Sequence, residues 1–544
     1  MAATIEDWLG KPAKIPKIDE IIATEVIVVG VGSAGVCAAC AAAEEGAKVV
    51  AIEALSSFRP HDTHQYGALD AKICKDAGLN VDLDAIYREM TSLTGNRING
   101  KLVYTLLHNV GPTFDWWYDN IMTDDIKAAC VLIGWPYPEH YDPSHDLYRQ
   151  FPGGIEYGGA PYIKGMKLIE ARGKKLGVNY RYGVRADQLI TSGGRVTSII
   201  GERAEGGYLQ VNASKGVILA TGRWTGNASM QKALNPAGVW SKKKLGQEYT
   251  DAWHPGNDFT KIPRQMGDGQ KMACWVGGWM SPEYDAAAAS ESVLGASAIL
   301  EVNNLGRRFV NEEAPVFERG TPIAYQPGSV AWAIFDDDWR TNVIPYQTIG
   351  HHNWEDKPYS SLPKMPGPVW AYLRGSYYLD YLQEQLRSII DNPGGSRIPG
   401  AGGQNYAASS IDKLADFMGF DAKAKATFLA TIERYNKLGS NGHDDDFGKD
   451  APKLNPIKQP PFYASKLIIT DLFLSTAYTR NGIVTDLNGN CQVIDKDHNI
   501  IPGLWAVGDI QGGRWTSRNT TPFCCPQNSF AMAAGRLAGK MAAR

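Results

Sequence analysis

The sequence predicts an α/β protein with at least two domains. Its 544 residues exceed the roughly 250–300 residues at which a single packed core usually stops growing. A β-branched run at 25–29 leads into a glycine-rich turn and an alanine-rich helical segment. Two later apolar runs, at 215–222 and 501–509, also end in turns of small residues. Buried strands that lead into such turns are typical of a parallel sheet flanked by helices.

The composition excludes several classes of protein. Lys and Arg (55) nearly balance Asp and Glu (58), and the basic residues are not clustered, so we expect no nucleic-acid partner. Residues 1–22 lack the apolar segment of a secretory signal, and residues 26–43 are too rich in Gly and Ala for a good membrane span. We therefore expect a cytoplasmic protein that does not cross a membrane.

Two polar or reactive patterns have plain structural interpretations. Cys37 and Cys40 form a C-x-x-C pair, but they lie within an alanine-rich helical segment, where cysteine is a small core residue. The acidic run Asp444–Asp446 lacks the spaced ligands of a calcium loop, so we interpret it as a solvated turn. We expect no metal site.

The glycine-rich turn has the spacing of a dinucleotide-binding loop. Gly30 permits the tight turn, Gly32 lets the backbone approach a pyrophosphate, and Gly35 allows close packing of helix on strand. A second predicted strand, 47–52, ends in Glu53, a position suited to accept hydrogen bonds from ribose hydroxyls. The pattern predicts a Rossmann-like βαβ unit with a diphosphate at the helix N-terminus. Further contacts are expected from the neighbouring Ser33, Ala34 and Ala54.

Several further segments carry a resemblance to a known family. They are the A-T-G turn at 220–222, the G-D-G at 267–269, the segment 304–312 (NLGRRFVNE), the segment 460–464 (PPFYA) and the G-D at 508–509. With these, the chain resembles the fumarate reductase/succinate dehydrogenase flavoproteins, a group that includes urocanate reductases and 3-ketosteroid dehydrogenases. The resemblance extends from about residue 24 to the C-terminus.

This resemblance implies both an architecture and a cofactor. A two-segment FAD-binding domain is expected at 22–278 and 477–544, with an inserted α+β capping domain at 279–476. His61 falls where succinate dehydrogenases carry a covalently flavinylated histidine; we expect noncovalent FAD, with covalent attachment through His61 as the alternative. The further residues that the resemblance assigns to FAD are Gly67, Ala68, Asp70, Ala186, Ala220, Thr221, Gly222, Asp268, Gly508, Asp509, Asn528 and Ser529.

The chain departs from the fumarate reductases at their catalytic positions. Val316 occupies the place of the arginine proton donor, and Arg319 follows three residues later. The relay segment 290–295 contains no arginine, and the family's histidine position corresponds to Tyr478. The substrate clamp reads 512–519 (GGRWTSRN), which supplies Arg514 and Arg518.

These departures favour a larger, partly aromatic or polycyclic substrate over a small dicarboxylate. Tyr478 would then act as the acid, Arg518 or Arg514 would hold a substrate oxygen, and Arg319 is a further catalytic candidate. The structural alternatives are a buried phenol for Tyr478, and a flavin-phosphate contact or an interdomain ion pair for Arg514 and Arg518.

The expected activity is that of an FAD-dependent oxidoreductase acting on a CH–CH or C=C bond conjugated to a carbonyl. The leading hypothesis is an enone or enoate reductase, in which hydride comes from flavin N5 and a proton from Tyr or Arg. One alternative is a 3-ketosteroid-like dehydrogenase that runs in the oxidising direction, and another is a non-catalytic flavin-binding electron-transfer protein. Because the sequence shows no haem or iron–sulfur motif, we expect an external electron donor or acceptor besides a small-molecule substrate.

Overall fold

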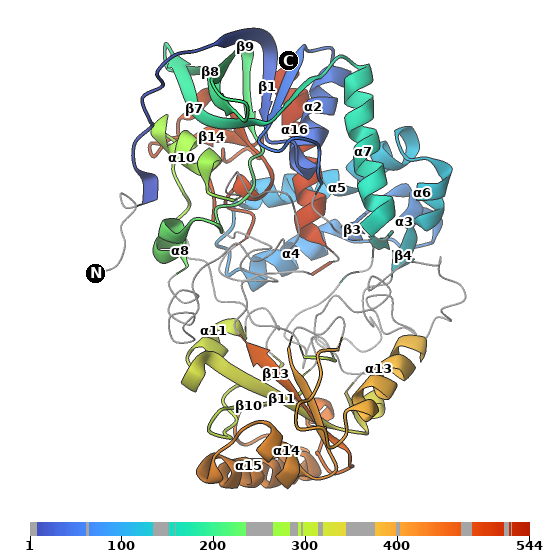
Figure 1. Ribbon diagram of the computed structural model, residues 1–544. Coiled ribbons are helices and arrows are strands. Elements are labelled where there is room, and N and C mark those ends of the chain that lie inside the picture. The colour runs from blue at the N-terminus through green and yellow to red at the C-terminus, as the bar shows by residue number, and fades with distance from the viewer. Residues whose placement is uncertain are drawn as a thin grey trace.

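The fold divides into two lobes, which Figure 1 shows one above the other. Elements from both ends of the chain form the first lobe, and elements from the middle of the chain form the second, which we call the cap. The computed structural model describes residues 8–60, 65–133, 151, 153–157, 159–235, 265–282, 292–294, 298–313, 319–343, 376–398, 403–468, 481–515, 522–523 and 525–544.

A large sheet organises the first lobe. In the described residues its main path runs β14-β15-β9-β1-β2-β6, with β7 and β8 attached through β9. The strands from β15 to β6 are parallel, and β14 is antiparallel to β15. The bounds are β1 (Glu20–Val29), β2 (Val49–Glu53), β6 (Asn179–Tyr182), β7 (Val184–Ser192), β8 (Arg195–Arg203), β9 (Tyr208–Leu219), β14 (Gln492–Ile494) and β15 (Ile500–Ala506). The α/β fold with a parallel sheet is confirmed.

Helices α2 (Ser33–Glu44) and α16 (Pro526–Ala543) lie side by side against this sheet (Figure 1). Gly535 and Gly539 make the close approach possible, because a Cβ there would lie 2.1 Å from the Ala34 carbonyl oxygen and 2.3 Å from that of Ala38. The last helix of the chain is thereby fixed to the helix that follows the glycine-rich turn.

Cys37 and Cys40 have no exposed surface, as expected of core residues. Burial raises the pKa of the Cys40 thiol to about 12 and moves the pKa of Cys37 in the same direction. Both thiols therefore stay protonated near neutral pH, and their interpretation as small core residues is confirmed.

Further helices and a small sheet complete the first lobe. The small sheet has the order β3-β5-β4 in the described residues. The bounds are β3 (Gln65–Gly67), β4 (Val131–Ile133), β5 (Gly154–Glu156), α3 (Lys72–Asp76), α4 (Leu83–Leu93), α5 (Gly100–Asn120), α6 (Asp124–Ala129), α7 (Gly159–Lys175), α8 (Ala228–Leu234) and α10 (Asp268–Trp275). No helix in the described part of the chain is both long enough and apolar enough to cross a bilayer.

The cap is built on an antiparallel sheet of order β10-β11-β13-β12. Strand β11 is buried along its whole length, because its alternate side chains enter two apolar cores on opposite faces of the sheet. The bounds are β10 (Leu300–Asn303), β11 (Val330–Asp336), β12 (Asn405–Ala408), β13 (Phe462–Ile468), α11 (Gly320–Ala324), α12 (Trp339–Asn342), α13 (Ser376–Ser388), α14 (Ile411–Phe417) and α15 (Ala422–Asn441). The residue limits of the capping domain stay a prediction.

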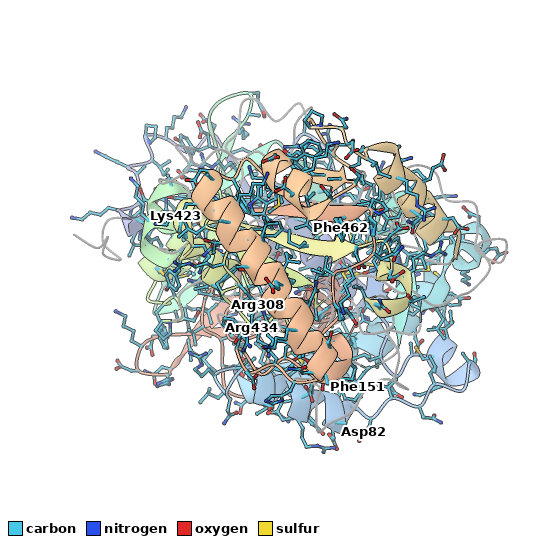
Figure 2. All side chains as sticks on the ribbon, turned by 90° about the horizontal axis from the view of Figure 1, so that it is seen from below. Asp82, Phe151, Arg308, Lys423, Arg434 and Phe462 are labelled. Carbon is cyan, nitrogen blue, oxygen red and sulfur yellow. The ribbon has the colours of Figure 1, made fainter. Side chains whose placement is uncertain are left out.

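The acidic run at 444–446 corrects one sequence interpretation. Asp444 is not solvated: its carboxylate is buried and accepts hydrogen bonds from Arg308 at 2.9 and 2.8 Å. Arg308 also donates to Glu312, and Lys449 lies 3.2 Å from Glu312. We call Arg308, Glu312, Asp444 and Lys449 the cap charge cluster. Figure 2 shows Arg308 next to Arg434, which belongs to helix α15.

Candidate cofactor and active site

The glycine-rich turn adopts the conformation that its three glycines predict. Gly30 has φ of 90° and donates its N–H to the Ile52 carbonyl at 2.8 Å. A Cβ on Gly35 would lie 1.9 Å from the Gly30 carbonyl oxygen, so only glycine fits there. Gly32 precedes α2, and nothing lies within 4 Å of the position its Cβ would take. The helix N-terminus is therefore open to an anionic group.

Glu53 closes the turn from the neighbouring strand. Its carboxylate accepts hydrogen bonds from the backbone N–H groups of Val31 (2.7 Å) and Leu55 (3.0 Å). The acid thus fixes the loop backbone, besides the ribose contact that the sequence predicts for it; the role predicted for Ala54, the next residue in the chain, stays a prediction. Both roles place a negative charge at the carboxyl end of β2.

The turn is joined to the last helix by a chain of hydroxyl and amide groups. The Ser33 Oγ lies 2.8 Å from the Tyr162 hydroxyl, which donates to Asn528 Oδ1 at 3.1 Å. Beside it, the Gly67 N–H donates to Ser529 Oγ at 2.7 Å. Burial raises the pKa of Tyr162, so its phenol stays protonated as a donor. Four predicted cofactor residues from distant segments therefore lie together.

Strands β9 and β15 place two further predicted loops at the carboxyl ends of the parallel strands, beside the glycine-rich turn. We call this region the sheet edge. Leu219 pairs with Ala506, so the loops that follow them, 220–223 and 507–509, leave the sheet side by side. The Ala220 N–H donates to the Val29 carbonyl. Thr221 Oγ1 is buried without a hydrogen-bond partner, and Gly222 has φ of 75° with open space around it.

Asp509 lies in this edge between two arginines. It accepts hydrogen bonds from Arg223 Nε at 2.9 Å and Arg514 Nη2 at 3.2 Å. Burial opposes ionisation of Asp509, but the two guanidinium groups outweigh it and hold its pKa below the usual range. Sequence reasoning did not identify Arg223; the available signal was a charged residue directly after the A-T-G turn. Trp515 stacks on Phe530 of α16 and is buried.

For other predicted cofactor residues, the contacts that the structure describes are with other residues of the protein. Asp268, at the start of α10, forms a two-point ion pair with Arg185 at 2.9 and 3.0 Å. Asp70 has φ of 60° and forms a half-exposed ion pair with Lys75 at 3.0 Å. Their assignment to the cofactor stays a prediction. The same holds for Ala68, whose N–H donates to Gly153, and for Ala186 and Gly508.

The structure separates the catalytic candidates. Arg514 belongs to the edge with Asp509, whereas Arg319 lies in the cap, just before α11, where its buried guanidinium pairs with Glu301. Burial raises the pKa of Glu301 to about 7, against the opposing effect of Arg319. Tyr478, Arg518 and His61 lie outside the described residues, so their roles, including covalent attachment through His61, stay predictions.

The residues of the sheet edge fit FAD. Gly32 and Gly222 leave space where the backbone can approach a diphosphate, and the open N–H groups at the start of α2 suit its charge. The buried Thr221 hydroxyl and the Nη1 atoms of Arg223 and Arg514 have no hydrogen-bond partner. An extended polar ligand along this edge would satisfy such groups.

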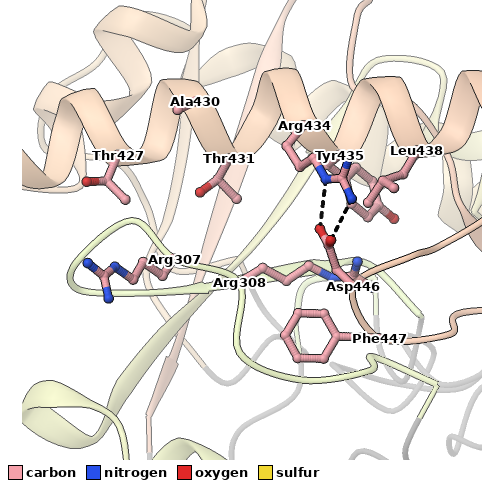
Figure 3. A pocket seen from close by; sticks show the side chains of 10 residues that line it. All are labelled: Arg307, Arg308, Thr427, Ala430, Thr431, Arg434, Tyr435, Leu438, Asp446 and Phe447. Carbon is pink, nitrogen blue, oxygen red and sulfur yellow. Dashed lines mark hydrogen bonds and ion pairs between the residues drawn. The ribbon is translucent and has the colours of Figure 1, made fainter.

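A pocket of 330 Å³ lies in the cap, formed by helix α15 and two neighbouring loops (Figure 3). Arg434 spans it to Asp446 at 2.7 Å, and Phe447 is 38% exposed at its rim. All of its walls belong to the cap, so it is separate from the sheet edge. The lining residues are Arg307, Arg308, Thr427, Ala430, Thr431, Arg434, Tyr435, Leu438, Asp446 and Phe447.

Comparisons with known proteins agree with this assignment. The model of the family described as FAD binding domain matches residues 25–519. The chain is 24% identical to vinyl phenol reductase of Lactiplantibacillus plantarum over 96% of both chains. It is 25% identical to a cytochrome-type fumarate reductase of Shewanella frigidimarina, over 96% of this chain and 77% of that one. The solved 3-ketosteroid-Δ4-(5α)-dehydrogenase of Rhodococcus jostii RHA1 shares its fold (TM-score 0.65, 20% identity, 98% of both chains).

A family match over most of the chain, together with a sheet edge that fits the cofactor, establishes the class of the protein. It belongs to the FAD-binding domain family of fumarate reductase-like flavoproteins and is an FAD-dependent oxidoreductase.

Proposed function

We propose that the chain reduces a C=C bond conjugated to a carbonyl in a medium-sized, partly aromatic or polycyclic enone or enoate. When bound, FAD supplies the hydride for such a bond. One observation carries the preference for this substrate class. The described part of the relay segment, 292–294, has no cationic side chain, and Val293 and Leu294 are buried in the apolar core of the cap.

The described arginines support a division of roles among the catalytic candidates. Arg319 pairs with Glu301 in the cap and Arg514 pairs with Asp509 at the sheet edge, so we assign the proton transfer to neither guanidinium. In the proposal, Tyr478 delivers the proton and Arg518 binds the substrate carbonyl oxygen. A guanidinium next to that oxygen would stabilise the negative charge that develops there during reduction.

The relatives support the substrate class through what their names state. One is named for the reduction of a vinyl phenol, and others are 3-oxosteroid dehydrogenases, of which one is 28% identical over 260 residues. The steroid relatives favour a second candidate, a dehydrogenase that oxidises a CH–CH bond next to a ketone. Either reaction also needs a small-molecule substrate and an external electron carrier.

Anaerobic mixing experiments test the proposal. The FAD-loaded protein is photoreduced and then mixed with cinnamate, with a steroid enone such as 4-androstene-3,17-dione, or with fumarate. We expect fast return of the oxidised flavin absorbance with cinnamate or the enone, and a slow return with fumarate. Fastest reoxidation by fumarate contradicts the proposal. Bleaching of the oxidised protein by a saturated ketone, without reoxidation by any enone, favours the dehydrogenase.

Tyr478→Phe tests the assignment of the acid. Loss of a general acid typically lowers a rate by about 10²- to 10⁴-fold, so we expect a decrease of this size in enone-dependent reoxidation while FAD stays bound. Tyr325→Phe is the matched control, because Tyr325 is 68% exposed in the cap. An unchanged rate in Tyr478→Phe would show that another group delivers the proton.

A further inference from the structure

The group of Arg223, Asp509 and Arg514, which we call the edge triad, lies beside the dinucleotide loop. Arg223 follows β9 and Asp509 follows the neighbouring parallel strand β15. A Cβ on Gly508 would lie 3.0 Å from the Cβ of Ala34, which places this loop against the start of α2. In open parallel sheets, ligands bind at the carboxyl ends of the strands, where these three side chains lie.

The edge triad carries an excess of positive charge. The guanidinium groups of Arg223 and Arg514 both donate to the Asp509 carboxylate. Arg514 also donates from Nε to the Gln511 carbonyl oxygen at 3.2 Å. Among the described residues the three side chains therefore sum to one positive charge. Arg514 has no exposed surface and Arg223 is 8% exposed. A buried charge is costly unless it is paired, so an anionic partner would stabilise this arrangement.

In each arginine, one buried nitrogen has no hydrogen-bond partner. Nη1 of Arg223 and Nη1 of Arg514 are both buried and have no partner. Polar atoms inside native proteins are nearly always satisfied by protein, water or ligand. Asp509 orients the two guanidinium groups through Nε of Arg223 and Nη2 of Arg514. The two Nη1 atoms therefore stay available to a third group.

We propose that Arg223 and Arg514, positioned by Asp509, bind a negatively charged oxygen of the molecule that occupies this edge. The bonds would be charge-assisted N–H···O⁻ hydrogen bonds. The oxygen belongs either to the flavin ring of FAD, which gains negative charge on reduction, or to the carboxylate of the substrate, and the same hydrogen bonds form in both cases. The inference rests on FAD binding at this edge, and its substrate arm rests on the proposed function.

Arg223→Gln tests the site in the FAD-loaded protein. Two quantities are measured: the flavin midpoint potential by dye equilibration, and the dissociation constants of cinnamate and the uncharged cinnamyl alcohol from flavin absorbance. If the oxygen belongs to FAD, we expect the potential to fall by about 30 mV, which is a tenfold change in a two-electron equilibrium. If it belongs to the substrate, we expect about tenfold weaker binding of cinnamate with cinnamyl alcohol unaffected.

Two further variants separate charge from packing. Arg172→Gln removes an arginine that pairs with Glu44 at the opposite end of α2, and we expect it to change neither quantity. Arg223→Lys keeps the positive charge and should recover at least half of the lost effect. The proposal is overturned if Arg223→Gln behaves like Arg172→Gln, or if the Lys and Gln variants behave alike. A wild-type protein that reduces no enone would refute the proposed function but leave the potential measurement intact.

Discussion

The contact between α2 and α16 predicts that one added methyl group weakens FAD binding. In Gly535→Ala the new Cβ would lie 2.1 Å from the Ala34 carbonyl oxygen, whereas ordinary contacts begin at 3.4 Å. The helices must therefore separate by about 1.3 Å, and overpacking of this kind typically costs about 1–3 kcal/mol. Because Ala34 belongs to the dinucleotide loop and Ser529 of α16 binds Gly67, the displacement acts on both sides of the cofactor site.

Titration of the apoprotein with FAD, followed by flavin fluorescence, measures the effect. A loss of about 1–3 kcal/mol raises the dissociation constant of FAD by about 5- to 150-fold. Gly394→Ala in the cap is the matched control, because its Cβ would meet only Asn392 Oδ1, at 3.4 Å. If Gly535→Ala binds FAD within twofold of both the wild type and Gly394→Ala, the close approach of the two helices does not shape the cofactor site.

Three further predictions concern single side chains. Glu53→Gln removes a charged acceptor from two backbone N–H groups and should weaken FAD binding about tenfold in the same titration. Arg308→Met removes a cationic partner from the two buried carboxylates Glu312 and Asp444 and should lower the free energy of unfolding by about 3–5 kcal/mol in urea. The exposed Arg307→Met should change it by less than about 0.5 kcal/mol. Burial raises the pKa of Glu301 from 4.5 to about 7, so the folded state retains a proton that the unfolded state releases. Stability contributed by this group is thus complete below about pH 4.5 and falls by about 3 kcal/mol as pH rises to about 7. Glu301→Gln should flatten that part of the stability curve, and an unchanged slope would contradict the assignment.

The first lobe could be predicted because its signals are local. The runs at 25–29 and 47–52, with the glycines between them, encode a strand, a turn, a helix and a second strand within about thirty residues. Gly30 and Gly35 are required by nearby backbone atoms, the carbonyl oxygens of Ala220 and Gly30. Because the requirement at Gly35 acts between residues that are close in sequence, a short motif reveals it.

The cap charge cluster could not be predicted because its partners are distant in sequence. Arg308 and Asp444 lie on separate loops, and only the folded sheet and helix α15 bring them into hydrogen-bond contact. Read locally, three consecutive aspartates indicate a solvated turn. The buried position of Asp444 depends on a cation 136 residues away.

Arg223 is an intermediate case that connects sequence to function. Its position at the end of β9 follows from the strand pattern, but its partner follows from the register between β9 and β15. A charged side chain in a buried turn of small residues conflicts with local preference, and such conflicts concentrate at functional sites because only a specific ligand or partner compensates their cost. Asp509 compensates one of the two buried positive charges at this edge; the anion that we place there would compensate the other, which would explain why two arginines share one acid.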